Sequence, residues 1–142
     1  MVTSMKVREI MSNRVLSLRH NDTVSQAAEL LCKNNVGSLP VVTDGELVGM
    51  LTDRDIVLRC VAGRSDATQM RIGEIMSTKL VTVSPEDSVE HAMTLMAEHK
   101  IRRLPVVEKT RIVGMLSLAD VARASVGTML AETVAEISSN YR

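Results

Sequence analysis

Two short stretches of the sequence carry the same polar side chains at the same spacing. In VGMLTDRD, Thr52 is followed three residues later by Asp55, and in VGMLSLAD, Ser117 is followed by Asp120. At the start of a helix, a hydroxyl and a carboxylate at this spacing form a capping box, which satisfies free backbone N–H groups. Each such cap stabilises a helix by about 0.5–2 kcal/mol. The simplest interpretation of both stretches is therefore structural.

The same arrangement also suits a ligand that contains both ribose and phosphate. A helix start presents backbone N–H groups and the positive end of the helix dipole to an anion. The hydroxyls of Thr52 and Ser117 can add a hydrogen bond to a phosphate. A carboxylate repels phosphate, but its two oxygens accept hydrogen bonds from two adjacent sugar hydroxyls. Asp55 and Asp120 therefore indicate ribose, and the capping and ligand-binding interpretations both stay open.

The elements that must position these side chains occur twice, because the sequence repeats after a shift of 65 residues. VREIMSNRVLSLRHNDTVSQAAELL aligns with IGEIMSTKLVTVSPEDSVEHAMTLM, VGSLPVV with IRRLPVV, and LVGMLTDRDIV with IVGMLSLADVA. A unit of this length is too small to be a comfortable domain alone. We expect each unit to bury its apolar face against the other.

Each repeat is predicted to form a β-α-β-β-α unit, which makes the fold class α+β. RVLSL and KLVTV are typical of short strands, and the apolar residues that follow Val24 and Val89 have helical spacing. LPVV and LVGML, separated by Asp44-Gly45, predict a hairpin, and a second helix begins at the hydroxyl residue. We expect one unit over residues 7–63, a linker over 64–71, a second unit over 72–128 and a C-terminal helical tail over 129–142.

Composition argues against several function classes. The formal net charge is zero, which disfavours broad attraction to nucleic acid or anionic lipid. No run approaches the ~20 apolar residues of a membrane span, and the N-terminus lacks the apolar core of a signal peptide. We therefore expect a cytoplasmic protein without nucleic-acid or membrane partners. No nucleophile elbow, HExxH or Gly-rich phosphate loop is present and the histidines are dispersed, so neither an enzyme nor a metal site is predicted.

The repeated motifs resemble a pair of CBS domains, an arrangement often called a Bateman module. Each repeat has an initial EIMS, a central LPVV and a glycine-hydrophobic-x-Thr/Ser-x-x-Asp stretch, and the resemblance extends from Val7 to Gly127. It implies two pseudo-symmetric units packed as one module, with adenosyl ligands bound in two clefts between the units. It also implies a regulatory sensor and a homodimer. Candidate ligands are AMP, ADP, ATP, NAD and S-adenosylmethionine; no cofactor is required, and the sequence does not identify the effector protein.

The resemblance also implies a set of residues for each cleft. In the family the aspartate holds ribose, the hydroxyl approaches phosphate, a cation just before LP often binds phosphate, and backbone of the opposite unit contacts adenine. The cleft of Asp120 is then expected to contain Ser117, Arg102, Arg103, Leu16, Ser17 and Val36. The cleft of Asp55 is expected to contain Thr52, Arg54, Ser38, Val81, Thr82 and Ile101.

The two clefts are not expected to be equal. Gly37 and Ser38 stand in the first repeat where the second has Arg102 and Arg103. Arg54 is a candidate replacement cation, although an exposed helix arginine explains it equally well. The chain has no Trp or Phe and a single Tyr, so an adenine ring would lie against aliphatic side chains and backbone.

The alternative function is a structural or protein-interaction module with no small-molecule ligand, in which both hydroxyl–aspartate pairs are only caps. A homodimer is predicted from the chain's own pattern as well. The second helices, expected over residues 56–61 and 121–126, carry apolar residues on more than one face, and exposed apolar patches tend to mark interfaces.

Overall fold

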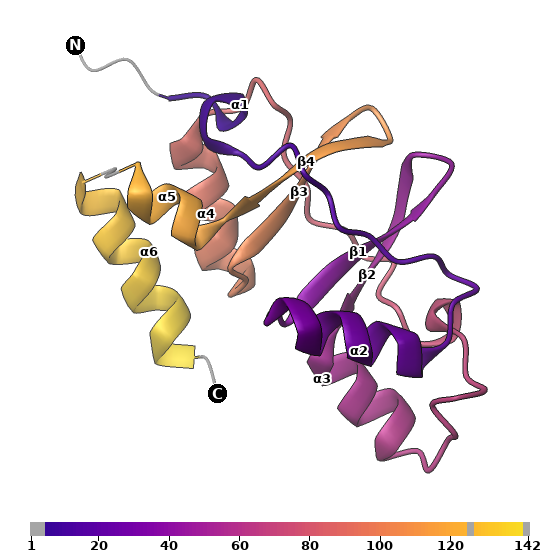
Figure 1. The fold of residues 1–142 in the computed structure, drawn as a ribbon. Coiled ribbons are helices and arrows are strands. Elements are labelled where there is room, and N and C mark those ends of the chain that lie inside the picture. The colour runs from indigo at the N-terminus through magenta and orange to yellow at the C-terminus, as the bar shows by residue number, and fades with distance from the viewer. Residues whose placement is uncertain (1–4, 125–126, 141–142) are drawn as a thin grey trace. The chain divides into compact units, whose positions relative to one another are not determined.

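The computed structural model describes residues 5–124 and 127–140, and only the backbone of residues 127–130 and 140. The chain divides into two compact units (Figure 1). We call Leu16–Leu80 the central unit, and Met1–Val15 together with Val81–Arg142 the terminal unit. Each unit has its own cluster of buried apolar side chains. The predicted α+β class with two similar units is confirmed.

The central unit is built around an antiparallel hairpin. Its elements are α2 (Val24–Asn34), β1 (Ser38–Thr43), β2 (Glu46–Thr52), α3 (Asp53–Asp55), the π-helix η1 (Ile56–Val61) and the 3-10 turn η2 (Ile72–Glu74). The register places Ser38 opposite Thr52. The predicted Asp44-Gly45 turn is confirmed, and both residues have the positive φ, 51° and 82°, that a type I′ turn requires.

The terminal unit repeats this hairpin and adds a C-terminal helix. Its elements are α1 (Val7–Ile10), α4 (Val89–His99), β3 (Arg103–Glu108), β4 (Arg111–Ser117), α5 (Leu118–Arg123) and α6 (Gly127–Asn140). Arg103 lies opposite Ser117. The expected tail helix is present as α6, which contacts α4 and buries Ile137. The predicted end of the second helix, residues 125–126, and the last two residues of the tail lie outside the described residues.

The predicted strands RVLSL and KLVTV are reduced to single bridges. Leu18 pairs in parallel with Val41, and Val83 pairs in parallel with Val106. The Leu18 N–H donates to the Pro40 carbonyl, and the Leu18 carbonyl accepts from Val42. The next ladder bond toward residue 16 would need an N–H from Pro40, which proline lacks. Pro105 interrupts the second ladder at the same point, so the prediction of full strands was wrong for both segments.

The segment that precedes each predicted strand packs against the other repeat, starting at the loop before the long helix of that repeat. The N–H groups of Val7 and Arg8 donate to carbonyls of Asp87 and Pro85, at 2.9 and 3.0 Å. In the central unit, Ile72 and Gly73 make the equivalent bonds to Asp22 and His20, both at 2.9 Å. We call residues 5–15 and 70–80 the two arms. The compact units therefore differ from the sequence repeats by an exchange of arms.

A glycine in each hairpin allows the arm to cross closely. Ser77 bridges to Met50 beside Gly49, and Ser12 bridges to Met115 beside Gly114. A Cβ at Gly114 would lie 2.8 Å from the Ser12 carbonyl oxygen, and one at Gly49 would lie 3.1 Å from that of Ser77. These distances are shorter than ordinary van der Waals contact. The repeated EIMS and VGML motifs are therefore the two sides of one packing contact.

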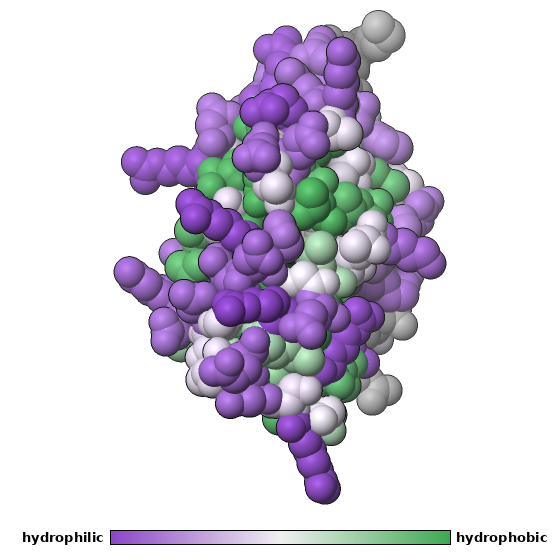
Figure 2. Space-filling model, turned by 90° about the vertical axis from the view of Figure 1, so that its right-hand side faces the viewer, coloured by the Kyte–Doolittle hydropathy of each residue, from purple (hydrophilic) through white to green (hydrophobic). Residues whose placement is uncertain are grey.

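Not every large apolar side chain is buried. The face in Figure 2 shows apolar side chains gathered among polar ones. Among the side chains that the structure describes, the most exposed large apolar ones are Val57, Leu58 and Val61 of η1, at 56%, 53% and 62%. Among the residues that the structure describes, no helix has both the length and the apolar character needed to cross a bilayer.

Candidate functional site

Both hydroxyl–aspartate pairs form capping boxes. In the central unit, the Asp55 N–H donates to Thr52 Oγ1 at 3.0 Å, and Asp55 Oδ2 accepts from the Thr52 N–H at 3.0 Å. In the terminal unit, the Asp120 N–H donates to Ser117 Oγ at 3.1 Å, and Asp120 Oδ2 accepts from the Ser117 N–H at 2.8 Å. The predicted capping geometry is confirmed for both pairs.

Asp120 has a further partner that sequence reasoning missed. Its second oxygen, Oδ1, forms an ion pair with Nη2 of Arg123, one turn along α5. The Asp120 side chain is only 12% exposed, whereas that of Arg123 is 72% exposed. The spacing of an acid and a base three residues apart on a helix was the available signal. The repeat places Leu58 at the position equivalent to Arg123.

The helix starts have few N–H groups left for an anion. The Leu118 N–H donates to the Arg102 carbonyl at 2.8 Å, and the Asp53 N–H donates to the Gly37 carbonyl at 2.9 Å. The third N–H of each helix is taken by the cap hydroxyl. In the central unit the Arg54 N–H also donates to Asp53 Oδ1, at 2.8 Å. A phosphate bound here would therefore depend more on arginine side chains than on the helix start.

Arg103 is a predicted cation that the fold brings near the hydroxyl–aspartate pair. It is the first residue of β3 and lies opposite Ser117, the last residue of β4. Burial lowers the pKa of the Arg103 guanidinium, while the Asp120 carboxylate partly opposes the shift. The guanidinium stays charged at neutral pH because its ordinary pKa is so high. Arg103, Ser117 and Asp120 thus form one cationic, hydroxyl-bearing and acidic cluster, which we call the Asp120 cluster.

The central unit has the same hairpin register but fewer cationic side chains beside its hydroxyl–aspartate pair. Ser38 lies opposite Thr52, as Arg103 lies opposite Ser117. A Cβ at Gly37 would lie 3.4 Å from Asp53 Oδ2, so an acidic group stands close to this position. Arg54 is exposed in the first turn after the cap. The difference in cationic residues between the two repeats, which the sequence predicts, is therefore also present in the folded units.

The residues expected to contact adenine are divided between the units. Leu16, Ser17 and Val36 belong to the central unit, and the equivalent set in the terminal unit is Val81, Thr82 and Ile101. Val36 and Ile101 each follow a left-handed cap residue, Asn35 or Lys100, at the end of a helix. The central unit thus carries the Asp55 pair together with the adenine-contact positions that the resemblance assigns to the Asp120 cleft. The terminal unit carries the Asp120 cluster together with the adenine-contact positions assigned to the Asp55 cleft.

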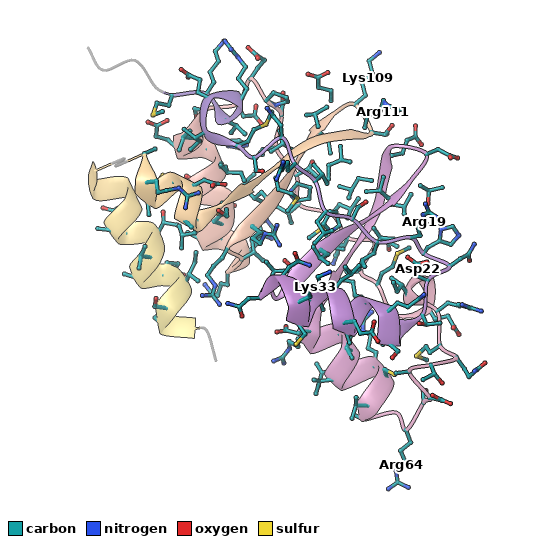
Figure 3. The ribbon with its side chains drawn as sticks, in the orientation of Figure 1. Arg19, Asp22, Lys33, Arg64, Lys109 and Arg111 are labelled. Carbon is teal, nitrogen blue, oxygen red and sulfur yellow. The ribbon has the colours of Figure 1, made fainter. Side chains whose placement is uncertain are left out.

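Other polar groupings in the fold involve different residues. A hollow in the central unit is lined by Arg19, Asp22 and Thr43 among others, and Figure 3 labels Arg19 and Asp22 there. A second hollow lies between α4 and α6. None of the predicted site residues lines either hollow. Within residues 5–124 and 127–140, no three His, Cys, Asp or Glu side chains gather in a way that could hold a metal ion.

Comparisons with known proteins give a consistent result. A family model described as CBS domain matches residues 7–61 and 72–127. The chain is 47% identical over 116 residues to the CBS domain-containing protein YhcV of Bacillus subtilis, with 82% of each chain covered. It is 35% identical over 117 residues to Hypoxic response protein 1 of Mycobacterium tuberculosis, again with 82% of each covered.

Solved structures of similar chains share the fold. The crystal structure of Hypoxic Response Protein I with two coordinated zinc ions has a TM-score of 0.76 and 34% identity, covering 84% of this chain and 98% of that one. The CBS domain pair of protein MJ0100, in complex with 5′-methylthioadenosine and S-adenosyl-L-methionine, has a TM-score of 0.75 and 30% identity. That match covers 88% of this chain and 98% of the other.

Proposed function

Because the chain belongs to the CBS-domain family, we propose that it is a regulatory module that binds adenine nucleotides or related adenosyl compounds. The observation that carries the proposal is the Asp120 cluster, in which a carboxylate, a hydroxyl and a guanidinium converge from α5, β4 and β3. These groups match the hydroxyls and phosphate of a nucleotide. The similar MJ0100 domain pair was solved with two adenosyl compounds, which supports the same ligand class.

Each residue of the Asp120 cluster has a role in this proposal. The Asp120 carboxylate accepts hydrogen bonds from the two ribose hydroxyls, because an ionised carboxylate is an acceptor with two oxygens. The Ser117 hydroxyl turns toward the phosphate, and Arg103 and Arg102 bind it through charge-assisted hydrogen bonds. Leu16, Ser17 and Val36 of the central unit contact the adenine with backbone atoms and aliphatic side chains.

The cleft of Asp55 is proposed to be the weaker phosphate site. Thr52 and Asp55 take the roles of Ser117 and Asp120, and Val81, Thr82 and Ile101 take the adenine. Ser38 stands where Arg103 stands in the other repeat, so Arg54 is the remaining candidate cation. A charge-assisted bond to phosphate is worth about 1.5–3 kcal/mol, which corresponds to roughly a tenfold to hundredfold difference in affinity.

We also propose that the module acts as a homodimer and signals to a separate effector protein. The exposed apolar side chains of η1, Val57, Leu58 and Val61, supply a surface for a second copy. Burial of such side chains in a dimer removes apolar area from water at about 25 cal/mol per Å². In this scheme the ligand is sensed and not chemically changed, so the module is not an enzyme.

A structural module without a ligand is the second candidate, because the observed capping boxes account for both hydroxyl–aspartate pairs on their own. Calorimetric titration with AMP, ADP, ATP, NAD and S-adenosylmethionine separates the two functions. We expect at least one adenosyl compound to bind at micromolar to millimolar concentration and to raise the melting temperature, since binding to the native state stabilises by mass action. If none of the five compounds gives binding heat or a thermal shift, the ligand-binding proposal is wrong and the structural module is the remaining function.

The inequality of the clefts has its own test. AMP, ATP and adenosine are titrated into the parent and into Arg103→Ala. The tighter phosphate-dependent site should weaken in Arg103→Ala and in higher salt, while the adenosine affinity of Arg103→Ala stays close to that of the parent at the same salt concentration. Two equal AMP sites that are unaffected by the substitution would contradict this part of the proposal.

A further inference from the structure

The Asp120 carboxylate is already occupied by a cation from its own helix. Oδ2 accepts the Ser117 N–H at 2.8 Å, and Oδ1 pairs with Arg123. Both oxygens are therefore engaged before any ligand arrives. With only 12% of the side chain exposed, there is little room for a ribose to bind beside the ion pair without replacing part of it.

The central unit has no such ion pair. Asp55 Oδ2 accepts the Thr52 N–H at 3.0 Å, and the other Asp55 oxygen makes no hydrogen bond or ion pair within the part of the chain that the structure describes. Leu58 occupies the position of Arg123, and it belongs to the π-helix η1, whose turns are wider than those of α5. The two aspartates are thus equivalent in the sequence repeat but differ in their partners.

We propose that Arg123 is a specificity-determining residue that competes with the sugar of a ligand for the Asp120 carboxylate. This inference rests on the proposed function of the Asp120 cluster. A neutral ligand such as adenosine must break the Arg123–Asp120 ion pair, and it has no negative charge with which the released guanidinium could pair. A ligand with a phosphate supplies a new negative charge near Arg103 and the released Arg123, so it regains the lost attraction.

Arg123 therefore makes the Asp120 cleft select for charged ligands. It does so by a penalty on neutral ones as well as by attraction of phosphate, which is how specificity is commonly built. The Asp55 cleft lacks the penalty because it lacks the cation. Since the Arg123 side chain is 72% exposed, its ion pair is weakened by salt, and the penalty on a neutral ligand should decline as salt rises.

The test measures adenosine and AMP affinity by calorimetry in an Asp55→Asn background, which isolates the Asp120 cleft. Arg123→Leu installs the residue that the central unit carries. Arg111→Leu is the matched control: it removes the same charge from the same unit but lies in the β3–β4 hairpin with Lys109 (Figure 3). At low salt, Arg123→Leu should bind adenosine about fivefold more tightly, near the upper limit for an exposed ion pair. AMP should not gain, and the control should behave as the background protein.

The salt dependence of adenosine binding provides a second measurement. In the Asp55→Asn protein, adenosine affinity should rise as NaCl is increased from 20 to about 500 mM, over which screening becomes strong. In Arg123→Leu it should stay flat. Equal adenosine affinity and equal salt response with and without Arg123 would overturn this inference and leave the proposed function standing. If no adenosyl compound binds the unmodified protein or any variant, both fail.

Discussion

Asp120 illustrates how one side chain serves both the fold and a proposed ligand. Its carboxylate accepts the Ser117 N–H and completes the cap of α5. The same carboxylate is the group that would bind a ribose. The two roles have different energetic sizes, because a lost cap costs about 1 kcal/mol of stability whereas hydrogen bonds to a charged group contribute about 1.5–3 kcal/mol each.

Asp120→Ala should therefore reduce affinity more than stability. We expect the unfolding free energy to fall by about 1 kcal/mol and AMP affinity at this cleft to fall by about 2–3 kcal/mol, measured by urea denaturation and calorimetry. Asp87→Ala is the control, because Asp87 Oδ2 also accepts a backbone N–H, that of Ser84 at 2.8 Å, and has no proposed ligand. If Asp120→Ala binds AMP as tightly as the parent does, the ribose role is wrong.

The glycine of each VGML motif has a packing role. Gly114 faces the Ser12 carbonyl and the Met11 sulfur, which a Cβ would approach to 2.8 and 2.7 Å. Backbone cannot move aside as easily as a flexible side chain. The absence of a Cβ is thus what permits the arm to lie on β4.

Gly114→Ala should destabilise the protein by about 1–3 kcal/mol, the usual cost of overpacking. Gly63→Ala is the matched control, because the nearest atom to a Cβ there, the Arg59 carbonyl oxygen, is at an ordinary 3.4 Å. Chemical denaturation of both variants measures the difference. Equal stability for the two would show that the arm moves away at little cost.

At the scale of the element, four of the helices whose first cap residue the structure describes begin with a hydroxyl cap. Thr23 and Ser88 cap α2 and α4, while Thr52 and Ser117 cap α3 and α5. In all four the hydroxyl accepts the N–H of the residue three positions later, so this capping bond cannot by itself mark a binding site. The distinction proposed for Thr52 and Ser117 is the aspartate three residues after each of them and, for Ser117, the arginine opposite.

A pair of serine substitutions separates capping from binding. Ser88→Ala and Ser117→Ala should each lower the unfolding free energy by about 0.5–2 kcal/mol. Only Ser117→Ala should also weaken AMP binding, by about 0.5–1.5 kcal/mol for one lost neutral hydrogen bond. Thermal denaturation and calorimetry check both parts. Equal affinity in the two variants would limit Ser117 to its cap.

The π-helix η1 has three apolar side chains that point away from the core of its own unit. Val57, Leu58 and Val61 are each more than half exposed, while Cys60 on the same element is fully buried in the central core. We expect the parent to be a dimer by light scattering at micromolar concentration, and Val61→Glu to shift it toward monomer because a buried charge at an interface is costly. A monomeric parent would count against the dimer.

At the scale of the whole molecule, the exchanged arms decide where the chain can be divided. Ile72 and Ile75 of the second arm are buried in the central core at 0% and 2% exposure. The Val24 N–H also donates to the Met70 carbonyl at 2.9 Å. A fragment that ends at the sequence repeat loses these contacts, although it contains both strands of the hairpin.

Leu16–Leu80 should therefore be a better-folded fragment than Val7–Gly63. Each buried isoleucine contributes about 1.5–3 kcal/mol, which is a large part of the stability of so small a unit. Circular dichroism and urea denaturation should show a cooperative transition for Leu16–Leu80 and none for Val7–Gly63. The reverse order of stability would mean that the arms contribute less than their burial implies.

Several features followed from the sequence alone because local interactions determine them. The Asp44-Gly45 turn, the helical spacing that follows Val24 and Val89, and the capping boxes at Thr52 and Ser117 depend on residues within a few positions of one another. The motifs within the repeats carried the resemblance to CBS domains, and the strand and helix patterns predicted the α+β class. The unequal arginines of the two repeats were equally visible, since they require only an alignment of the chain with itself.

Other features depended on contacts between residues distant in sequence. The arm of one repeat lies on the hairpin of the other because Gly114 admits Ser12 and Gly49 admits Ser77, and no local pattern records which hairpin receives which arm. The first strands shrink to single bridges because their partners place Pro40 and Pro105 where a donor is needed. Arg103 lies near Asp120 only because β3 and β4 pair in a register that sets it opposite Ser117. Local propensity depends only on residues close together in sequence, whereas these contacts depend on packing between residues far apart in sequence. Only the tertiary structure therefore decides them.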